Sequence, residues 1–191
     1  RVTLIYPDYT VMRLFSSPGT TRVERGGWYA EGVAALAAAL KLQHHEVSLL
    51  HVTQPPERQD FVARLEATHP DVIGFSVRTS AVPAVTEWTR WTREAGPAPI
   101  VWGGYHPSLA PEECMRIQGV DALIQGDADL VLPQVVDAWA AGDDLQGIPG
   151  VWWKDDGEVR HAPVGPLVAD LDALPIPDFG LFDRNQLIAT R

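Results

Sequence analysis

The sequence predicts an α/β domain built on an open, doubly wound sheet of five parallel strands, followed by a β-hairpin and an extended linker. Three observations predict it. Short apolar segments alternate five times with segments of helical periodicity, as expected for strand–helix units joined by right-handed crossovers. Three of the apolar segments end in glycines or small polar residues, and the alternation stops after Gly142. Because 2-1-3-4-5 is a common order for five such units, we expect that strand order.

The predicted strands are short apolar runs, and each predicted helix carries one apolar face. The segment 28–42 shows the helical pattern, because Tyr29, Val33, Leu36 and Leu40 lie four, three and four residues apart. Its alanines favour close packing against a sheet. The expected strands are 2–6, 46–52, 72–77, 100–102 and 122–125, and the expected helices are 28–42, 58–68, 82–94, 109–117 and 130–141.

Two regions outside these units have a different pattern. The segment 9–27 is long and polar, which is typical of a functional or disordered loop. Residues 150–160 have the pattern of a hairpin with an Asp156-Gly157 turn, and the prolines that follow exclude regular structure. The predicted divisions are a Rossmann-like domain over 1–142 and a hairpin with a proline-rich linker over 143–191.

The composition is that of a globular protein with an acidic surface. Hydrophobic residues make up 46% of the 191 residues, which argues against disorder, and the formal net charge of −10 argues against a surface for nucleic acid. Cys114 is the single cysteine, so this stretch alone forms neither an internal disulfide nor an iron–sulfur cluster. No apolar run has the length of a membrane span and no signal segment is evident, so we expect a cytoplasmic protein without membrane or nucleic-acid partners.

The ends of three predicted strands indicate a ligand site. Gly103 and Gly104 follow the fourth strand and have no side chains to keep a large flat ligand from the backbone. Ser76 and Thr79 lie at the end of the third strand, and residues 126–129 follow the fifth. In doubly wound sheets, ligands bind outside the carboxyl ends of the strands, so we expect a ligand at this edge.

The motifs of several common ligand classes are absent. The chain has no Gly-x-Gly-x-x-Gly after its first strand, no Gly-x-x-x-x-Gly-Lys-Ser/Thr and no Gly-x-Ser-x-Gly, so the signatures of dinucleotide binding, nucleotide-triphosphate binding and esterases are missing. None of the six histidines is spaced from another as in a catalytic zinc site, and we predict no protein metal ligand. The residues alone name no catalytic group. The alternative to a ligand site is a plain doubly wound domain in which Gly103-Gly104 only makes a tight turn.

Four segments, taken in order, resemble one family. They are 73–77, 101–107 with 111–113, 120–129 and 170–178. On these segments the chain resembles, over nearly its whole length, the cobalamin-binding domain found ahead of the catalytic core in many radical S-adenosylmethionine enzymes. Residues 187–191 resemble the strand before the three-cysteine loop of that family. The resemblance therefore implies a radical S-adenosylmethionine core after Arg191, with a 4Fe-4S cluster and S-adenosylmethionine.

The resemblance also implies a corrinoid site at the carboxyl edge of the sheet. Gly103 and Gly104 are its expected low floor beside the nucleotide tail of cobalamin, and Ser76 is the expected hydrogen-bond partner of the tail's base. His106 has two interpretations: it contacts the corrin edge, or it caps the fourth helix or packs below Pro107. The implied cofactor-binding residues are Asp8, Tyr9, Thr10, Ser76, Val77, Arg78, Thr79, Gly103, Gly104, Tyr105, His106, Pro107, Gly126 and Asp127.

Two segments depart from related patterns. Methyl-carrying cobalamin domains have Asp-x-His-x-x-Gly after the first strand, and its His binds cobalt from below, whereas residues 8–13 contain no His. For that lower face we consider Arg13, Arg78 and Trp28. Residues 126–129 are Gly-Asp-Ala-Asp where the family has Gly-Glu-Gly-Glu, which keeps the charge and loses one glycine.

The activity implied for the parent enzyme is methylation of an unactivated carbon or a phosphinate in a small-molecule or peptide substrate. A cobalamin-dependent radical cyclase or oxidase is the alternative within the family. A stand-alone corrinoid carrier and a vestigial interaction domain without cofactor are alternatives from other classes. Three cysteines after Arg191 would favour the enzyme, and a bulky residue over the glycine floor would favour the vestigial domain.

Overall fold

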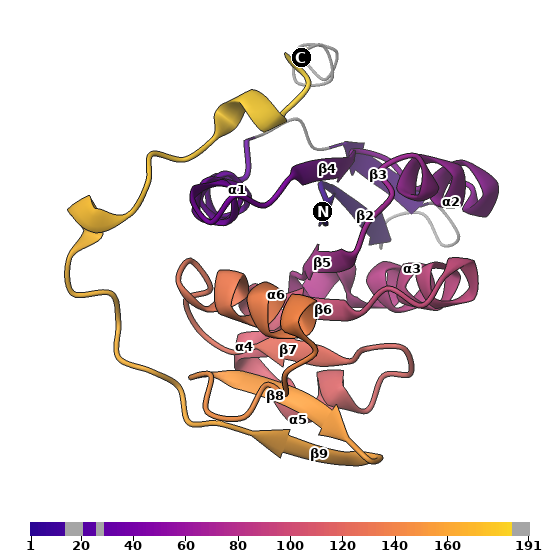
Figure 1. Ribbon diagram of the computed structural model, residues 1–191. Helices are drawn as coiled ribbons and strands as arrows, with labels where there is room; N and C mark the ends of the chain where they lie inside the picture. Colours follow the sequence, from indigo (N-terminus) through magenta and orange to yellow (C-terminus); the bar gives the residue numbers. More distant parts are fainter. Residues whose placement is uncertain (14–20, 26–28, 185–191) are drawn as a thin grey trace.

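Five parallel strands form most of a seven-stranded sheet, and a C-terminal hairpin extends that sheet (Figure 1). The computed structural model describes residues 1–13, 21–25 and 29–184. The parallel strands lie in the predicted order 2-1-3-4-5, and the hairpin pairs antiparallel with the last of them. In sheet order the strands are β4 (Val47–Val52), β1 (Val2–Pro7), β5 (Val72–Ser76), β6 (Ile100–Gly103), β7 (Ala122–Ile124), β8 (Val151–Asp155) and β9 (Glu158–His161).

Helices cover both faces of this sheet, because its central strands are apolar on both sides. Leu4 and Val101 belong to one core cluster, whereas Ile5 and Trp102, their neighbours in the chain, belong to the other. This alternation is the two-residue period of a strand. The first cluster includes side chains of α1 (Glu31–Leu42) and α6 (Val131–Ala141), and the second those of α2 (Arg58–Glu66), α3 (Val82–Ala95) and α5 (Pro111–Met115).

The predicted helix 109–117 is wrong in its bounds. The structure has two short helices instead, α4 (Tyr105–Leu109) and α5, with Ala110 between them at φ −138° and ψ 58°. Pro111 explains the break, because a proline disfavours the helical conformation in the residue before it. The chain therefore enters α4 directly after Gly104, and Cys114 lies in α5. Cys114 is fully buried, as expected for a small apolar residue, and burial raises the pKa of its thiol to about 11.

The segment predicted to be a loop, 9–27, contains an antiparallel ribbon. β2 (Tyr9–Arg13) pairs with β3 (Thr21–Arg25), and Val11 lies opposite Val23. The ribbon forms a sheet of its own, separate from the main sheet. Its polar composition concealed it, because strands are recognised by a sustained apolar alternation that the sequence of 9–27 lacks.

After β9 the chain runs as an extended linker, as predicted, with the short turns η2 (Leu171–Ala173) and η3 (Phe179–Leu181) (Figure 1). The linker begins beside β8, where the amide of Gly150 donates to the carbonyl of Pro163 over 2.9 Å. It returns to α1, where the amide of Asp178 donates to the carbonyl of Ala34, also over 2.9 Å. Within the described residues, no helix is long and apolar enough to cross a membrane.

Candidate functional site: a glycine-floored cavity

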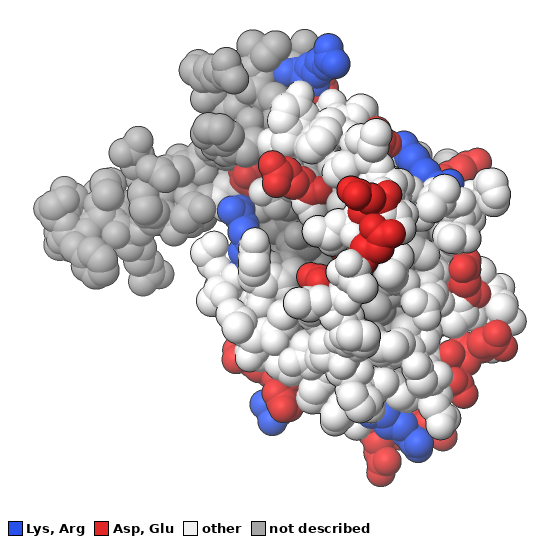
Figure 2. Space-filling model, turned by 90° about the vertical axis from the view of Figure 1, so that its left-hand side faces the viewer, with Lys and Arg blue, Asp and Glu red and all other residues white. Residues whose placement is uncertain are grey.

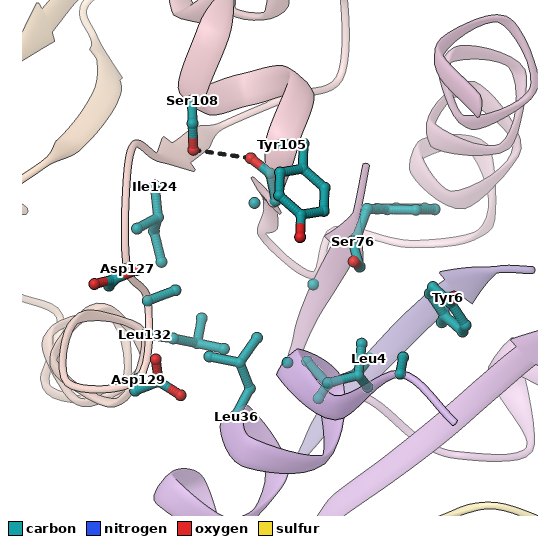
Figure 3. Close-up of a pocket in the computed structure, with 18 of the residues that line it drawn as sticks. Leu4, Tyr6, Leu36, Ser76, Tyr105, Ser108, Ile124, Asp127, Asp129 and Leu132 are labelled. Carbon is teal, nitrogen blue, oxygen red and sulfur yellow. Dashed lines mark hydrogen bonds between the residues drawn. The ribbon is translucent and has the colours of Figure 1, made fainter. Parts of the chain in front are cut away.

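A cavity of about 580 Å³ opens at the carboxyl edge of the sheet, where α1 and α6 flank the ends of β1, β5, β6 and β7 (Figure 3). Its deeper walls are apolar and come from strands and helices alike. Such a concave, largely apolar space with polar groups at its mouth is typical of small-molecule sites. The apolar side chains of these walls include Leu4, Leu36, Val101, Ile124 and Leu132.

Two strand positions that face α1 and α6 carry no side chain, and one of them borders open space. Leu4 and Val101 point to this face, and the two-residue period places Gly74 and Gly103 on it too. A Cβ on Gly74 would lie 3.1 Å from Leu4 Cδ2. A Cβ on Gly103 would meet nothing within 4 Å. Gly103 therefore borders open space that almost any other residue would fill.

Gly104 has a different role from its neighbour, because its backbone conformation requires glycine. Its φ is +100°, and a Cβ there would lie 3.1 Å from both the amide nitrogen and the carbonyl oxygen of Val77. Val77 in turn donates its amide to Gly103 over 2.7 Å and accepts from the amide of His106 over 3.0 Å. The loops after β5 and β6 thus lie in backbone contact, which keeps the floor of the cavity low.

Ser108 joins the loops on opposite sides of the cavity mouth. Its hydroxyl donates to the carbonyl of Gly104 over 2.9 Å and accepts from the amide of Gly126 over 3.0 Å. The carbonyl of Ser108 accepts from Gln125 Nε2, and Gln125 Oε1 accepts from the indole of Trp152 on β8. This network ties the mouth of the cavity to the C-terminal hairpin, so the hairpin supports the site without lining it.

The mouth is bordered by carboxylates, and Figure 2 shows acidic side chains around a hollow in this face. Glu31 comes from the start of α1, and Asp127 and Asp129 come from the loop after β7. Burial, and then the charge of Asp127, raise the pKa of Asp129. Carboxylates at such a mouth can accept hydrogen bonds from a ligand that carries amide or other N–H groups.

Arg78 contributes the cationic group of the mouth. Its Nη2 donates to the carbonyl of Pro7 over 2.7 Å, and its guanidinium lies 5.7 Å from the centre of the Tyr6 ring. The side chain is therefore held at the ends of β1 and β5 while its buried Nε has no partner among the described residues.

The sequence of this region identifies its family. The family model for the B12 binding domain matches residues 22–136. The chain belongs to the B12-binding domain family. The match confirms the cobalamin-binding domain of the resemblance and covers three of its four sequence segments, all but 170–178. The matched residues contain the glycine floor and both carboxylates of the loop after β7.

Two curated relatives have sequences similar to this B12-binding domain. A methyltransferase of Pyrococcus horikoshii whose activity is uncharacterized is 29% identical over 157 residues, which are 81% of this chain and 34% of that protein. The anaerobic magnesium-protoporphyrin IX monomethyl ester cyclase of Synechocystis is 27% identical over 146 residues, 74% of this chain and 29% of that protein. The chain thus spans about a third of each relative.

Solved structures show the same fold. The radical S-adenosylmethionine methyltransferase TsrM from Kitasatospora setae, with cobalamin and a [4Fe-4S] cluster, superposes with a TM-score of 0.67 at 20% identity over 92% of this chain and 31% of that chain. The cobalamin-dependent S-adenosylmethionine radical enzyme OxsB, with aqua-cobalamin, gives 0.73 at 18% identity over 99% of this chain and 25% of that chain. The B12-binding domain therefore has the fold of one part of these larger proteins.

The cavity brings together half of the residues predicted for the cofactor. These lie at the ends of β5, β6 and β7, as the strand-end argument required. Tyr105 is 78% exposed and points from the start of α4 over the mouth (Figure 3). The predicted residues that line the cavity are Ser76, Arg78, Gly103, Gly104, Tyr105, Gly126 and Asp127.

The other predicted residues do not line the cavity. Asp8 is buried and hydrogen-bonded to His51, and Tyr9 packs against Trp88 in the opposite core cluster. His106 is buried in α4 with its Nδ1 3.3 Å from the hydroxyl of Thr79, so the packing interpretation of this residue fits the structure. Val77 and Pro107 are buried behind the glycine loop, and of Thr10 only the backbone, in β2, belongs to the described part.

Several lining residues escaped prediction because they lie inside strands and helices rather than at strand ends. Leu4, Gly74 and Ile124 are examples. Alternation along β5 contained a signal, since Gly74 is the one small residue within the apolar run 72–75. A glycine inside a buried strand often marks a close approach of another group.

We predict that the two floor glycines respond differently to alanine. Gly104→Ala should destabilise the fold by about 1–3 kcal/mol, because the added Cβ meets the Val77 backbone at a positive φ. Gly103→Ala should change stability by less than about 1 kcal/mol, because its Cβ enters open space. Urea unfolding followed by tryptophan fluorescence measures both, and equal losses of stability at the two positions would contradict the distinct roles of these glycines.

Proposed function

We propose that this chain binds cobalamin, with the nucleotide tail of the cofactor inserted into the cavity between α1 and α6. The observation that supports this most is the glycine floor, where Gly103 borders open space at the carboxyl edge of the sheet, the edge at which doubly wound folds bind ligands. The match of the B12 binding domain to residues 22–136 supports the choice of ligand.

The residues of the cavity fit such a tail. Leu4, Val101 and Ile124 offer apolar contacts to a flat aromatic base, and Gly103 leaves the space that a Cβ would occupy. The hydroxyl of Ser76 lines the cavity, and no hydrogen bond within the described residues engages it, so it is free to donate to a nitrogen of the base. The carboxylates at the mouth suit the amide groups around the corrin.

We assign to the protein the tasks of binding, orienting and shielding the cofactor. Cobalamin, when bound, supplies a cobalt centre that exchanges methyl groups. Residues 8–13 supply no histidine to that centre. Of the three side chains considered for the lower face, Arg78 lines the cavity, whereas Arg13 and Trp28 offer no described side chain.

For the whole protein we propose a cobalamin-dependent radical S-adenosylmethionine methyltransferase acting on an unactivated carbon or a phosphinate. The similarity to the P. horikoshii methyltransferase over 81% of the chain supports methyl transfer. The similarity to the Synechocystis cyclase favours a cobalamin-dependent cyclase as the second candidate. In either case the 4Fe-4S cluster, S-adenosylmethionine and the substrate would bind to a core beyond this chain.

Cobalamin binding is tested by titrating the purified chain with hydroxocobalamin, desalting it and recording the visible spectrum. We predict a retained corrinoid spectrum for the natural sequence and its loss in Gly103→Phe, whose ring would fill the floor of the cavity while the unfolding midpoint stays near that of the natural chain. The matched control is Gly96→Phe, because Gly96 lies at the end of α3 in open space with an extended backbone. Retention by Gly103→Phe equal to that of the control would contradict the proposed position of the tail.

Methyl transfer is distinguished from cyclisation by the products formed from S-adenosylmethionine. We predict that the reduced full-length protein, reconstituted with hydroxocobalamin and iron–sulfur cluster, forms S-adenosylhomocysteine, because the cofactor must receive a methyl group. Chromatography of the quenched reaction measures it. Formation of 5′-deoxyadenosine without S-adenosylhomocysteine would favour the cyclase instead.

A further inference from the structure

A row of four aromatic rings connects two walls of the cavity, and its two middle rings lie outside the cavity. Tyr6 stacks on His51 with 5.5 Å between ring centroids, His51 meets the edge of Phe182 at 5.5 Å, and Phe182 meets Tyr29 at 5.5 Å. The first and last rings, Tyr6 and Tyr29, both line the cavity. The two middle rings are buried: His51 is 4% exposed and Phe182 is 4% exposed.

The ring that completes this row comes from the C-terminal linker. Phe182 follows η3, and we call residues 178–182 the linker anchor. The anchor is fixed to α1 through the amide of Asp178, which donates to Ala34, and through the carboxylate of Asp178, which pairs with Lys41. Phe179, also in the anchor, meets the edge of Tyr29 with 5.3 Å between centroids.

Tyr29 contacts the anchor through its aromatic ring. It precedes α1, is 46% exposed, and its described ring contacts are both with the anchor. Tyr6 is held from its other side by Arg78, and His51 by a 2.8 Å hydrogen bond to Asp8. The wall that Tyr6 forms is therefore firm without the anchor, whereas the wall that Tyr29 forms depends on it.

We propose that the linker anchor is coupled to the cofactor site. Docking of the anchor on α1 and filling of the cavity then stabilise each other. This inference rests on the proposed cobalamin binding. A ligand in the cavity would contact both Tyr6 and Tyr29. Outside the cavity, Phe182 contacts Tyr29 directly and Tyr6 through His51. Each partner favours the arrangement that the other needs, and by linkage the effect is equal in both directions.

The coupling links the state of the cavity to the C-terminal end of the domain. Undocking of the anchor would loosen the wall at the start of α1 and weaken cofactor binding, and an empty cavity would leave the anchor less firmly held. Filling of the cavity thus changes how firmly the linker is docked, and the linker leads to the chain beyond residue 184. Phe182 acts as a positioning residue, since it does not line the cavity itself.

Hydrogen exchange of the whole chain, with and without hydroxocobalamin, tests the proposal without any substitution. We expect the amides of residues 178–182 to exchange at least about fivefold more slowly when the cavity is filled, the lower end of typical coupling between sites. The internal reference is α3, whose exchange should stay unchanged because it packs on the opposite face of the sheet and its residues do not line the cavity. Unchanged exchange at 178–182 in a chain that binds hydroxocobalamin would overturn the coupling.

Affinity measurements test the reverse direction. Phe182→Ala should weaken hydroxocobalamin binding by about the factor by which hydroxocobalamin slows hydrogen exchange in the anchor, because linkage is reciprocal. The control is Leu167→Ala, in a linker residue that is 81% exposed and should bind as the natural chain does. Phe182→Leu, which keeps most of the volume but removes the ring, serves if the alanine variant fails to fold, and it should also bind more weakly than the natural chain.

The outcomes separate the two proposals. If the natural chain does not retain hydroxocobalamin, both cobalamin binding and the coupling fail. If it retains hydroxocobalamin and the Phe182 variants that fold bind with unchanged affinity, the coupling alone fails and Phe182 is a packing residue. Weaker binding in those variants together with slower exchange at 178–182 supports the coupling.

Discussion

The hollow on one face of the sheet is the feature on which the rest of the site depends. Protein interiors are close-packed, so space inside a domain must be created by leaving side chains out. Gly103 does this on the face that α1 and α6 cover, and Gly74 on the neighbouring strand lets Leu4 lie close to the backbone there. Because the hollow reaches the edge of the sheet, it is open to a ligand rather than sealed as a void. An apolar group that enters it gains the free energy of apolar burial, about 25 cal/mol per Å².

The surrounding structure keeps this hollow open. Gly104 allows the loop after β6 to lie against Val77, and Ser108 ties that loop to Gly126 on the other side of the mouth. The hairpin β8–β9 holds the same loops through Trp152 and Gln125. At the opposite wall the linker packs on α1 and on Tyr29. The elements outside the five-stranded core therefore act on the site as supports.

Much of the fold was predictable because strand–helix alternation permits few topologies. The order of the parallel strands is the one common for five such units, and the site at their carboxyl ends follows from where Ser76, Gly103 and Gly126 fall in the chain. The break at Pro111 was predictable from local chemistry as well, since Ala110 precedes a proline.

The parts that escaped prediction depend on contacts between distant segments. In a strand buried on both sides, the sequence does not tell which face leaves room for a ligand, so Leu4 has the pattern of an ordinary core residue. The ribbon β2–β3 forms a sheet of its own within a segment of polar composition. The contact of Phe182 with His51 joins the linker to β4, and nothing local in the proline-rich linker indicates such a contact.

The most direct test is a crystal structure of this chain in complex with hydroxocobalamin. The account predicts that the base of the nucleotide tail lies between α1 and α6 against the backbone of Gly74 and Gly103, with the corrin over the mouth. A complex in which the base stays bound to cobalt, or in which the corrinoid lies elsewhere on the protein, would contradict it.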